Sequence, residues 1–196
     1  CRDGEVYEGA VFISDIHPEQ TCKLVKRSER MKNAYRHRMA ALPNTFGMFT
    51  VSLRMKPQSL EYFNYNRYIY GRSGVWTFYE DGGPVSGLMA SCRVPEDGNR
   101  FASQVDLLTP MTWEKCAVWS GTEVGRRGGD YEAMKGRVAD ECIRLAERVM
   151  PGLRGWVSEC YTSTPLTYRD YTGAPEGTAY GLRKDYRNPL AALLSV

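Results

Sequence analysis

The chain has 196 residues, a net charge of +3, 42% hydrophobic and 25% charged residues, which is the composition of a globular protein. That length allows a hydrophobic core in one domain, or at most two. The small net charge gives no indication of a nucleic-acid partner, and no apolar run reaches the roughly eighteen residues of a membrane-spanning helix.

Cysteines and histidines argue against a metal site. The two histidines stand alone and no C-x-x-C pair occurs, so no zinc site is predicted. In a chain with its own core, reduced and mostly buried thiols are favoured over disulfides, which indicates a reducing, cytoplasmic compartment. The chain begins with Cys1 and no charged-then-apolar leader follows, so we expect a piece of a longer protein. The six cysteines are Cys1, Cys22, Cys92, Cys116, Cys142 and Cys160.

The pattern of the first forty or so residues predicts a strand followed by a basic helical region. Residues 5–14 form a short apolar run, which predicts a buried strand. Over residues 24–42, large residues recur every three or four positions with basic residues between them, which predicts one or two amphipathic helices with a basic outer face. Two interpretations stay open: a solvated helix packed on a sheet, or a face for a membrane surface formed by Lys26, Arg27 and Arg30.

Two segments predict strands next. Residues 46–55 alternate between apolar and polar, which is typical of a half-buried strand. Residues 60–70 are rich in aromatic residues with high β propensity. Here Tyr62, Tyr65 and Tyr68 either line a ligand groove or belong to an aromatic strand that packs on its sheet.

The second half alternates strands with one clear helix. Residues 85–94 and 101–108 are predicted strands joined by a hairpin loop, and the glycine-rich residues 121–129 lack any phosphate-binding pattern. Apolar residues at helical spacing predict a helix over 131–150, and residues 155–161 predict a short strand. The fold class that follows is α+β, with a mainly antiparallel or mixed sheet of about five to seven strands and helices packed on one face.

Residues 162–180 combine tyrosine, threonine, proline and glycine without an apolar period. Such a segment predicts an ordered loop that wraps something, because tyrosine side chains need a surface on which to pack. No nucleophile–base pair or dinucleotide fingerprint occurs in the sequence. The paired carboxylates, Asp15 with Glu19 and Glu80 with Asp81, stand in turn contexts where exposure is expected, so no catalytic residue is assigned.

Three motifs together resemble a known group of enzymes. They are A-V-F-I-S-D-I-H-P-E-Q-T with Leu24 (10–24), Y-E-A-M-K opening at Tyr131, and T-P-L-T-Y-R-D-Y-T-G-A-P-E-G-T-A-Y-G (164–181). In this order they resemble the phytoene desaturase, carotenoid isomerase and retinol saturase-like FAD-dependent oxidoreductases of the amine-oxidase-like flavoprotein superfamily. Residues 45–125 add only a compatible order of strands.

The resemblance implies a substrate-side portion of a larger flavoenzyme. In that group the glycine-rich FAD fingerprint and a second flavin-contacting segment lie in parts that this chain lacks, so no FAD is expected on the chain itself. Residues 1–16 would be an edge of the flavin domain, 17–161 the substrate-binding domain, and 162–196 a return segment towards the flavin-binding part. The third motif, residues 164–181, is here called the family string. Its positions that match the group, expected near substrate and flavin, are Thr164, Pro165, Thr167, Tyr168, Tyr171, Gly177, Tyr180 and Gly181.

The implied function is oxidation, reduction or isomerisation of an isoprenoid or carotenoid-like apolar substrate by the whole protein. The expected partners are that small molecule, the remaining flavin domain of the same polypeptide and, as an open alternative, a peripheral membrane surface; a nucleic-acid partner is not expected. Whether this portion alone is an enzyme stays open. A stand-alone module that binds apolar ligands or membrane surfaces is the alternative from another class, and a purely structural domain is a third.

Overall fold

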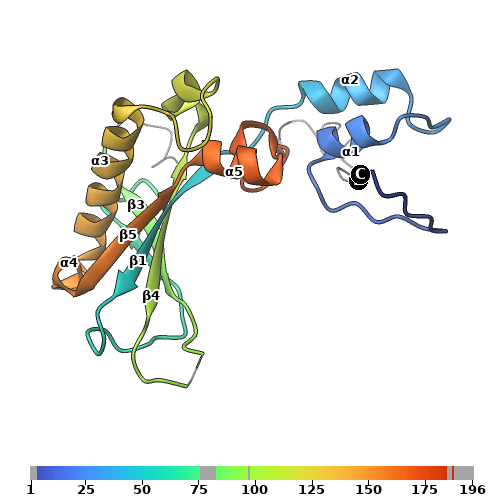
Figure 1. Cartoon of the computed structure of the whole chain (residues 1–196). Helices are drawn as coiled ribbons and strands as arrows, with labels where there is room; N and C mark the ends of the chain where they lie inside the picture. The colour runs from blue at the N-terminus through green and yellow to red at the C-terminus, as the bar shows by residue number, and fades with distance from the viewer. Residues whose placement is uncertain (1–3, 76–82, 97, 185–186, 188–196) are drawn as a thin grey trace. The chain divides into compact units, whose positions relative to one another are not determined.

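The computed structural model describes residues 4–75, 83–96, 98–184 and 187, which divide into two compact units (Figure 1). Unit 2 spans residues 44–181, and unit 1 comprises the described residues on either side of it. The prediction of an edge of a flavin domain over 1–16, a substrate domain over 17–161 and a return segment over 162–196 stays a prediction.

Unit 2 is built on a five-stranded, fully antiparallel sheet in the order β2-β3-β4-β1-β5. This confirms the predicted α+β class. The strand predicted at 46–55 is β1, and the two strands of the predicted hairpin are neighbours in the sheet. The strands are β1 (Gly47–Met55), β2 (Arg67–Tyr70), β3 (Gly87–Cys92), β4 (Gln104–Met111) and β5 (Val157–Ser163).

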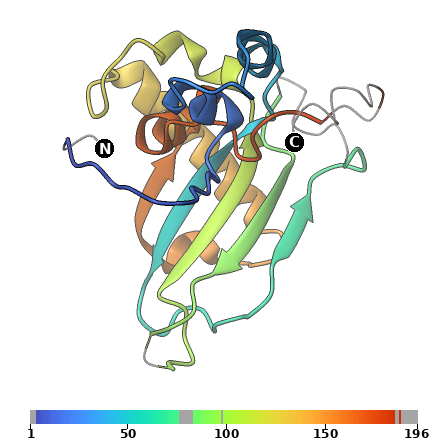
Figure 2. The same ribbon diagram turned by 90° about the vertical axis from the view of Figure 1, so that its right-hand side faces the viewer.

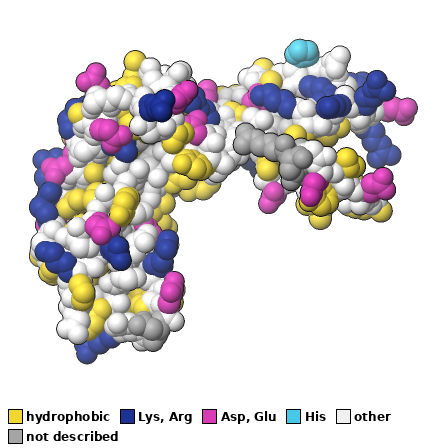
Figure 3. All heavy atoms as spheres, viewed as in Figure 1, with side chains coloured by type: hydrophobic (Ala, Val, Ile, Leu, Met, Phe, Trp, Pro, Cys, Tyr) yellow, Lys and Arg dark blue, Asp and Glu magenta, His cyan; other side chains and the backbone are white. Residues whose placement is uncertain are grey.

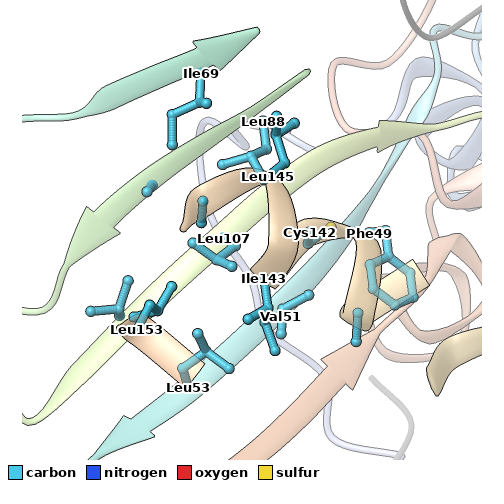
Figure 4. Packing of buried hydrophobic residues seen from close by; sticks show 14 of the residues in the cluster. Phe49, Val51, Leu53, Ile69, Leu88, Leu107, Cys142, Ile143, Leu145 and Leu153 are labelled. Atoms are coloured by element: carbon cyan, nitrogen blue, oxygen red, sulfur yellow. The ribbon is translucent and has the colours of Figure 1, made fainter. Parts of the chain in front are cut away.

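The helix α3 (Gly129–Ala146) covers one face of this sheet and forms the core with it (Figures 1 and 2). Along β1 every second residue is buried, so Phe49, Val51 and Leu53 all point towards α3. They meet Cys142, Ile143 and other side chains of the helix (Figure 4). Each large apolar side chain buried in this way stabilises the fold by about 1.5–3 kcal/mol.

Short helices and 3₁₀ turns connect the strands of the sheet with α3. The helix α4 (Leu153–Trp156) follows α3 and leads into β5, after a turn in which Gly152 has a φ of +87°. After β4 come two 3₁₀ turns, η1 (Trp113–Lys115) and η2 (Ala117–Trp119), and a third, η3 (Pro175–Gly177), lies near the end of the unit.

The helix α5 (Pro165–Thr172) overturns the prediction that residues 162–180 contain no regular structure. Thr164 is the N-cap, Pro165 occupies the first helical position, and Gly173 ends the helix with a φ of +72°. These are standard start and stop residues of a helix, and they are sufficient although the helix carries no long apolar stripe.

Unit 1 contains α1 (Pro18–Leu24) and α2 (Asn33–Ala41), so the predicted helical region over 24–42 is interrupted. Its small core consists of Cys22, Met39 and Leu182. Residues 25–32 are not helical, and the Arg36 guanidinium donates hydrogen bonds to the carbonyls of Cys22 and Val25 at the end of α1.

The predicted strand over residues 5–14 is wrong for the structure of this chain, because none of these residues is assigned to a strand. Val11, Phe12 and Ile13 are 80%, 74% and 94% exposed. A strand needs a neighbour to accept its backbone hydrogen bonds, and the described residues supply none to this segment.

Candidate functional site

The residues of the family string first build the structure of α5. The Thr164 side chain accepts a hydrogen bond from the backbone N–H three residues on, and the Thr167 hydroxyl accepts one from the N–H of Thr164, which completes a capping box. The Thr164 hydroxyl also bonds the buried hydroxyl of Tyr131 at 2.8 Å. Thr164 and Pro165 are both buried, so neither is available to a ligand.

The two glycines of the string serve close packing of the backbone. Gly177 has a φ of +60°, and a Cβ there would lie 1.9 Å from the carbonyl oxygen of Pro165. Gly181 has a φ of +72°, and its carbonyl accepts hydrogen bonds from the Thr45 N–H at 2.9 Å and the Thr178 hydroxyl at 3.0 Å. The string therefore closes on its own first turn and on the residues before β1.

Three tyrosines of the string differ in what they contact. The Tyr168 hydroxyl lies 2.7 Å from the Thr50 hydroxyl on β1. Tyr180 is 72% exposed with its ring edge-on to Phe46 at 5.8 Å, and Tyr171 is 76% exposed. Tyr168 thus joins α5 to the sheet, while the other two present most of their surface outward.

A buried ion pair fixes α5 from its other side. The Arg127 side chain is 4% exposed and pairs with the Asp170 carboxylate, whose side chain is 18% exposed. The same guanidinium donates to the Thr122 carbonyl at 3.0 Å and to its hydroxyl at 2.9 Å. The glycine-rich segment 121–129 therefore has a structural role, because its Arg127 holds α5 through Asp170.

The face of the sheet opposite α3, here called the outer face, is turned towards the viewer in Figure 2. Its side chains change from apolar to charged along the strands. The first row of cross-strand neighbours lies level with Tyr168 and is largely apolar. The second row is polar, and the third is charged. The rows are Tyr68, Met89, Leu108, Thr50 and Ser163; then Ser91, Asp106, Ser52 and Tyr161; then Gln104, Arg54 and Glu159.

These rows share a face because they alternate with the buried residues, and paired residues point to the same side. Arg54 is four positions after Thr50 on β1, which corresponds to about 13 Å along the strand. The outer face therefore changes from apolar to charged over the length of a medium-sized ligand.

A groove of about 590 Å³ marks the charged end of the outer face, lined by Ser52, Arg54, Arg93 and Tyr161 among others. The Arg54 guanidinium lies 3.4 Å from the Glu159 carboxylate. The hydrogen bond from Tyr161 lowers the pKa of Glu159, with Arg54 adding to the effect, and the carboxylate raises the pKa of the Tyr161 phenol. At neutral pH the pair is therefore a carboxylate and a protonated phenol, which suits binding of a polar group better than proton transfer.

The predicted groove tyrosines separate in the structure. Tyr68 lies on β2 in the apolar row, whereas Tyr62 and Tyr65 precede the strand and line a separate hollow of about 450 Å³. Only the last part of the predicted strand over 60–70 forms, because residues 60–62 instead bond with residues 100–102. The residues missed from the sequence are Met89, Leu108 and Thr50, which only strand pairing brings beside Tyr68.

The three basic residues predicted for a membrane face lie in the segment between α1 and α2, not on a helix. Lys26, Arg27 and Arg30 are all exposed, and Leu24 before them is 70% exposed. Figure 3 shows basic side chains gathered over the same unit. No helix among the described residues has the length and hydropathy of a membrane span.

Thiols and metal ligands add no reactive centre among the described residues. All five described cysteines are free, and burial raises the pKa of Cys116 to about 11 and of Cys142 to about 12. Within the described ranges no group of three or more His, Cys, Asp or Glu side chains could hold a metal ion.

Comparison with known proteins gives one kind of relative. No family model matches the chain. Over 97 residues it is 32% identical to the all-trans-retinol 13,14-reductase of Macaca fascicularis and 31% identical to that of Homo sapiens. The matched segment covers 48% of this chain and 16% of each relative, so the chain matches about a sixth of their length. The chain is thus similar to part of a group of oxidoreductases, without being identified as any one member.

Proposed function

We propose that this chain is the substrate-binding portion of a phytoene dehydrogenase-related, FAD-dependent oxidoreductase that acts on an isoprenoid or carotenoid-like apolar substrate. The relatives are named for reduction of all-trans-retinol, which supports an oxidoreductase and a substrate of this class. The observation that carries the binding role is the outer face, where the apolar row, completed by Tyr168, lies beside a polar and charged end.

The outer face suits a long apolar molecule with one polar end. An apolar chain would lie across Met89 and Leu108, both half-buried, with Tyr68 at the margin. Its polar group would reach towards Ser52 and the groove at Arg54. Apolar surface of this kind supplies affinity, and a few polar groups fix the orientation.

The flavin itself does not fit the residues described here. A dinucleotide is normally held at a parallel strand–glycine turn–helix unit, and every strand pair in the described sheet is antiparallel. We therefore derive no chemical step through the flavin. In the proposed whole protein it would carry the redox chemistry, while this portion positions the substrate.

A binding assay tests the role of the outer face. All-trans-retinol is titrated into the 196-residue chain, and quenching of tryptophan fluorescence reports binding. The Leu108→Asp variant should bind at least about fivefold more weakly, because it places a charge on the apolar row. The control is Val118→Asp, at a 79% exposed site outside that row. Equal affinity of Leu108→Asp and the control would rule out the outer face as the binding surface.

The oxidoreductase assignment has its own test in the whole protein. The parent polypeptide purified with its remaining domains should show flavin absorbance, whereas the 196-residue chain should be colourless. A parent protein without flavin absorbance would end the assignment, independently of any retinol binding.

A membrane surface is a second candidate partner, favoured by exposed Leu24 beside the basic residues of unit 1. Sedimentation with anionic liposomes should fall strongly when Lys26, Arg27 and Arg30 are changed to Glu. The charge-matched control changes the exposed Arg126, Arg137 and Arg183 to Glu. Equal pelleting of wild type and the first variant would defeat the membrane proposal.

A further inference from the structure

An arginine-lined cavity lies beside α3, away from the outer face. Its volume is about 460 Å³, and it is formed by the second half of α3 together with residues 71–72 and 83–86, which flank β2 and β3. Because α3 packs on the face opposite the outer face (Figure 1), this cavity belongs to a different part of unit 2 from the proposed substrate surface.

Two arginines in this cavity form no ion pair with any residue that the structure describes. Arg144 lies in the last turn of α3 and Arg148 in the turn that follows the helix; both are exposed, and neither side chain forms an ion pair or hydrogen bond with a described residue. The carboxylate of Glu141 is also in the lining, but it accepts a hydrogen bond from the Val85 N–H at 2.8 Å. The described lining also includes Arg72, so it carries three arginines against the one carboxylate of Glu141 and has a positive balance.

The spacing of the two guanidinium groups selects the ligand. The two arginines are four residues apart at the point where the chain leaves α3, and each presents its own fork of donors to the cavity. A carboxylate has two oxygens and can fill one fork, whereas a phosphate or diphosphate spreads several oxygens over both. Leu145, between the two arginines in the chain, supplies apolar surface for the group that carries the phosphate.

We propose that this cavity binds the phosphate group of a phosphate monoester or diphosphate, with Arg144 and Arg148 as its two anchoring side chains. The site does not depend on the proposed function, since it uses no residue of the outer face. It gives the chain a second binding function, specific for a phosphorylated molecule.

Titration of the 196-residue chain by calorimetry tests this site, with inorganic pyrophosphate as the soluble probe. A second arm measures binding to phosphatidylcholine vesicles with and without phosphatidic acid. The test variant is Arg144→Gln/Arg148→Gln. The control, Arg126→Gln/Arg137→Gln, removes the same two charges at exposed positions outside the cavity. Circular dichroism establishes that each variant retains α3.

The expected result is that pyrophosphate binds wild type and control within about twofold of each other, while the test variant binds at least about tenfold more weakly. If only vesicles with phosphatidic acid show this pattern, the phosphate belongs to a lipid headgroup and the site stands. Equal weakening by both variants, or no dependence on Arg144 and Arg148 in either arm, overturns the proposal.

Discussion

Gly177→Ala should be among the most damaging single substitutions in unit 2. The residue has a φ of +60°, and the new Cβ would lie 1.9 Å from the carbonyl oxygen and 2.5 Å from the carbonyl carbon of Pro165. Those atoms belong to the first turn of α5, so the clash is with backbone and no side-chain rotation relieves it. The 3₁₀ turn η3 and α5 would have to move apart by about 1.5 Å to restore an ordinary contact.

The expected cost has two parts. A left-handed conformation costs an alanine about 1–2 kcal/mol relative to glycine. Separating α5 from η3 then weakens packing around Leu166, which is fully buried, and this brings the total to about 3–5 kcal/mol.

Gly173→Ala is the matched control for this prediction. Gly173 also has a positive φ, of +72°, but a Cβ there would meet nothing within 4 Å. It should therefore cost only the conformational part, about 1–2 kcal/mol. Urea unfolding followed by circular dichroism gives both free energies of unfolding. If the two variants differ by less than about 0.5 kcal/mol, the close approach of Gly177 to Pro165 does not contribute as described.

Three further predictions concern residues around α5 and β5. Thr164→Val should lower the free energy of unfolding by about 2 kcal/mol in the same urea assay, because it removes the cap and leaves the buried Tyr131 hydroxyl without its hydrogen-bond partner; an unchanged midpoint would contradict this. Asp170→Ala should lower the free energy of unfolding by about 3 kcal/mol, because it leaves the buried Arg127 guanidinium without its carboxylate. The double variant Asp170→Ala/Arg127→Met should recover much of this loss, whereas additive losses in the double variant would argue against the pairing. Cys160 is exposed, whereas burial raises the pKa of Cys142 to about 12. The number of thiols that react rapidly with Ellman's reagent at pH 8 should therefore fall by one in Cys160→Ser and stay unchanged in Cys142→Ser. Both thiols should react faster as pH rises, because partial burial also raises the pKa of Cys160.

Local patterns predict the elements whose environment is local. The alternation of Phe49, Val51 and Leu53 identifies β1, and helical spacing identifies α3, because in each case one face is buried by the element's own periodicity. The start of α5 is also predictable from the sequence, since Thr164 and Thr167 form a capping box and Pro165 stands at the first helical position. Its short apolar stripe led to a loop prediction instead.

Other features depend on contacts between distant residues. The helix over 24–42 breaks where Arg36 reaches back to the carbonyls at the end of α1, and no spacing rule reveals such a bond. The outer face is a similar case: Met89, Leu108 and Thr50 become neighbours only through the strand order. Sequence similarity supports the proposed class of enzyme, whereas the proposed substrate surface exists only once the strands have paired in the sheet.

The pairing of β1 with β5 has a consequence for the order of folding. Thr50 pairs with Ser163, more than a hundred residues away in the chain, whereas β3 and β4 are joined by a short connection. Closing the longer loop costs more chain entropy, so we expect the β3–β4 hairpin to form early and β5 late. The segment from α5 to Gly181 follows β5 directly, so Tyr168 reaches Thr50 only after the rest of the outer face exists. The apolar row is thus the last surface to be completed, and the first to be uncovered when the protein opens locally.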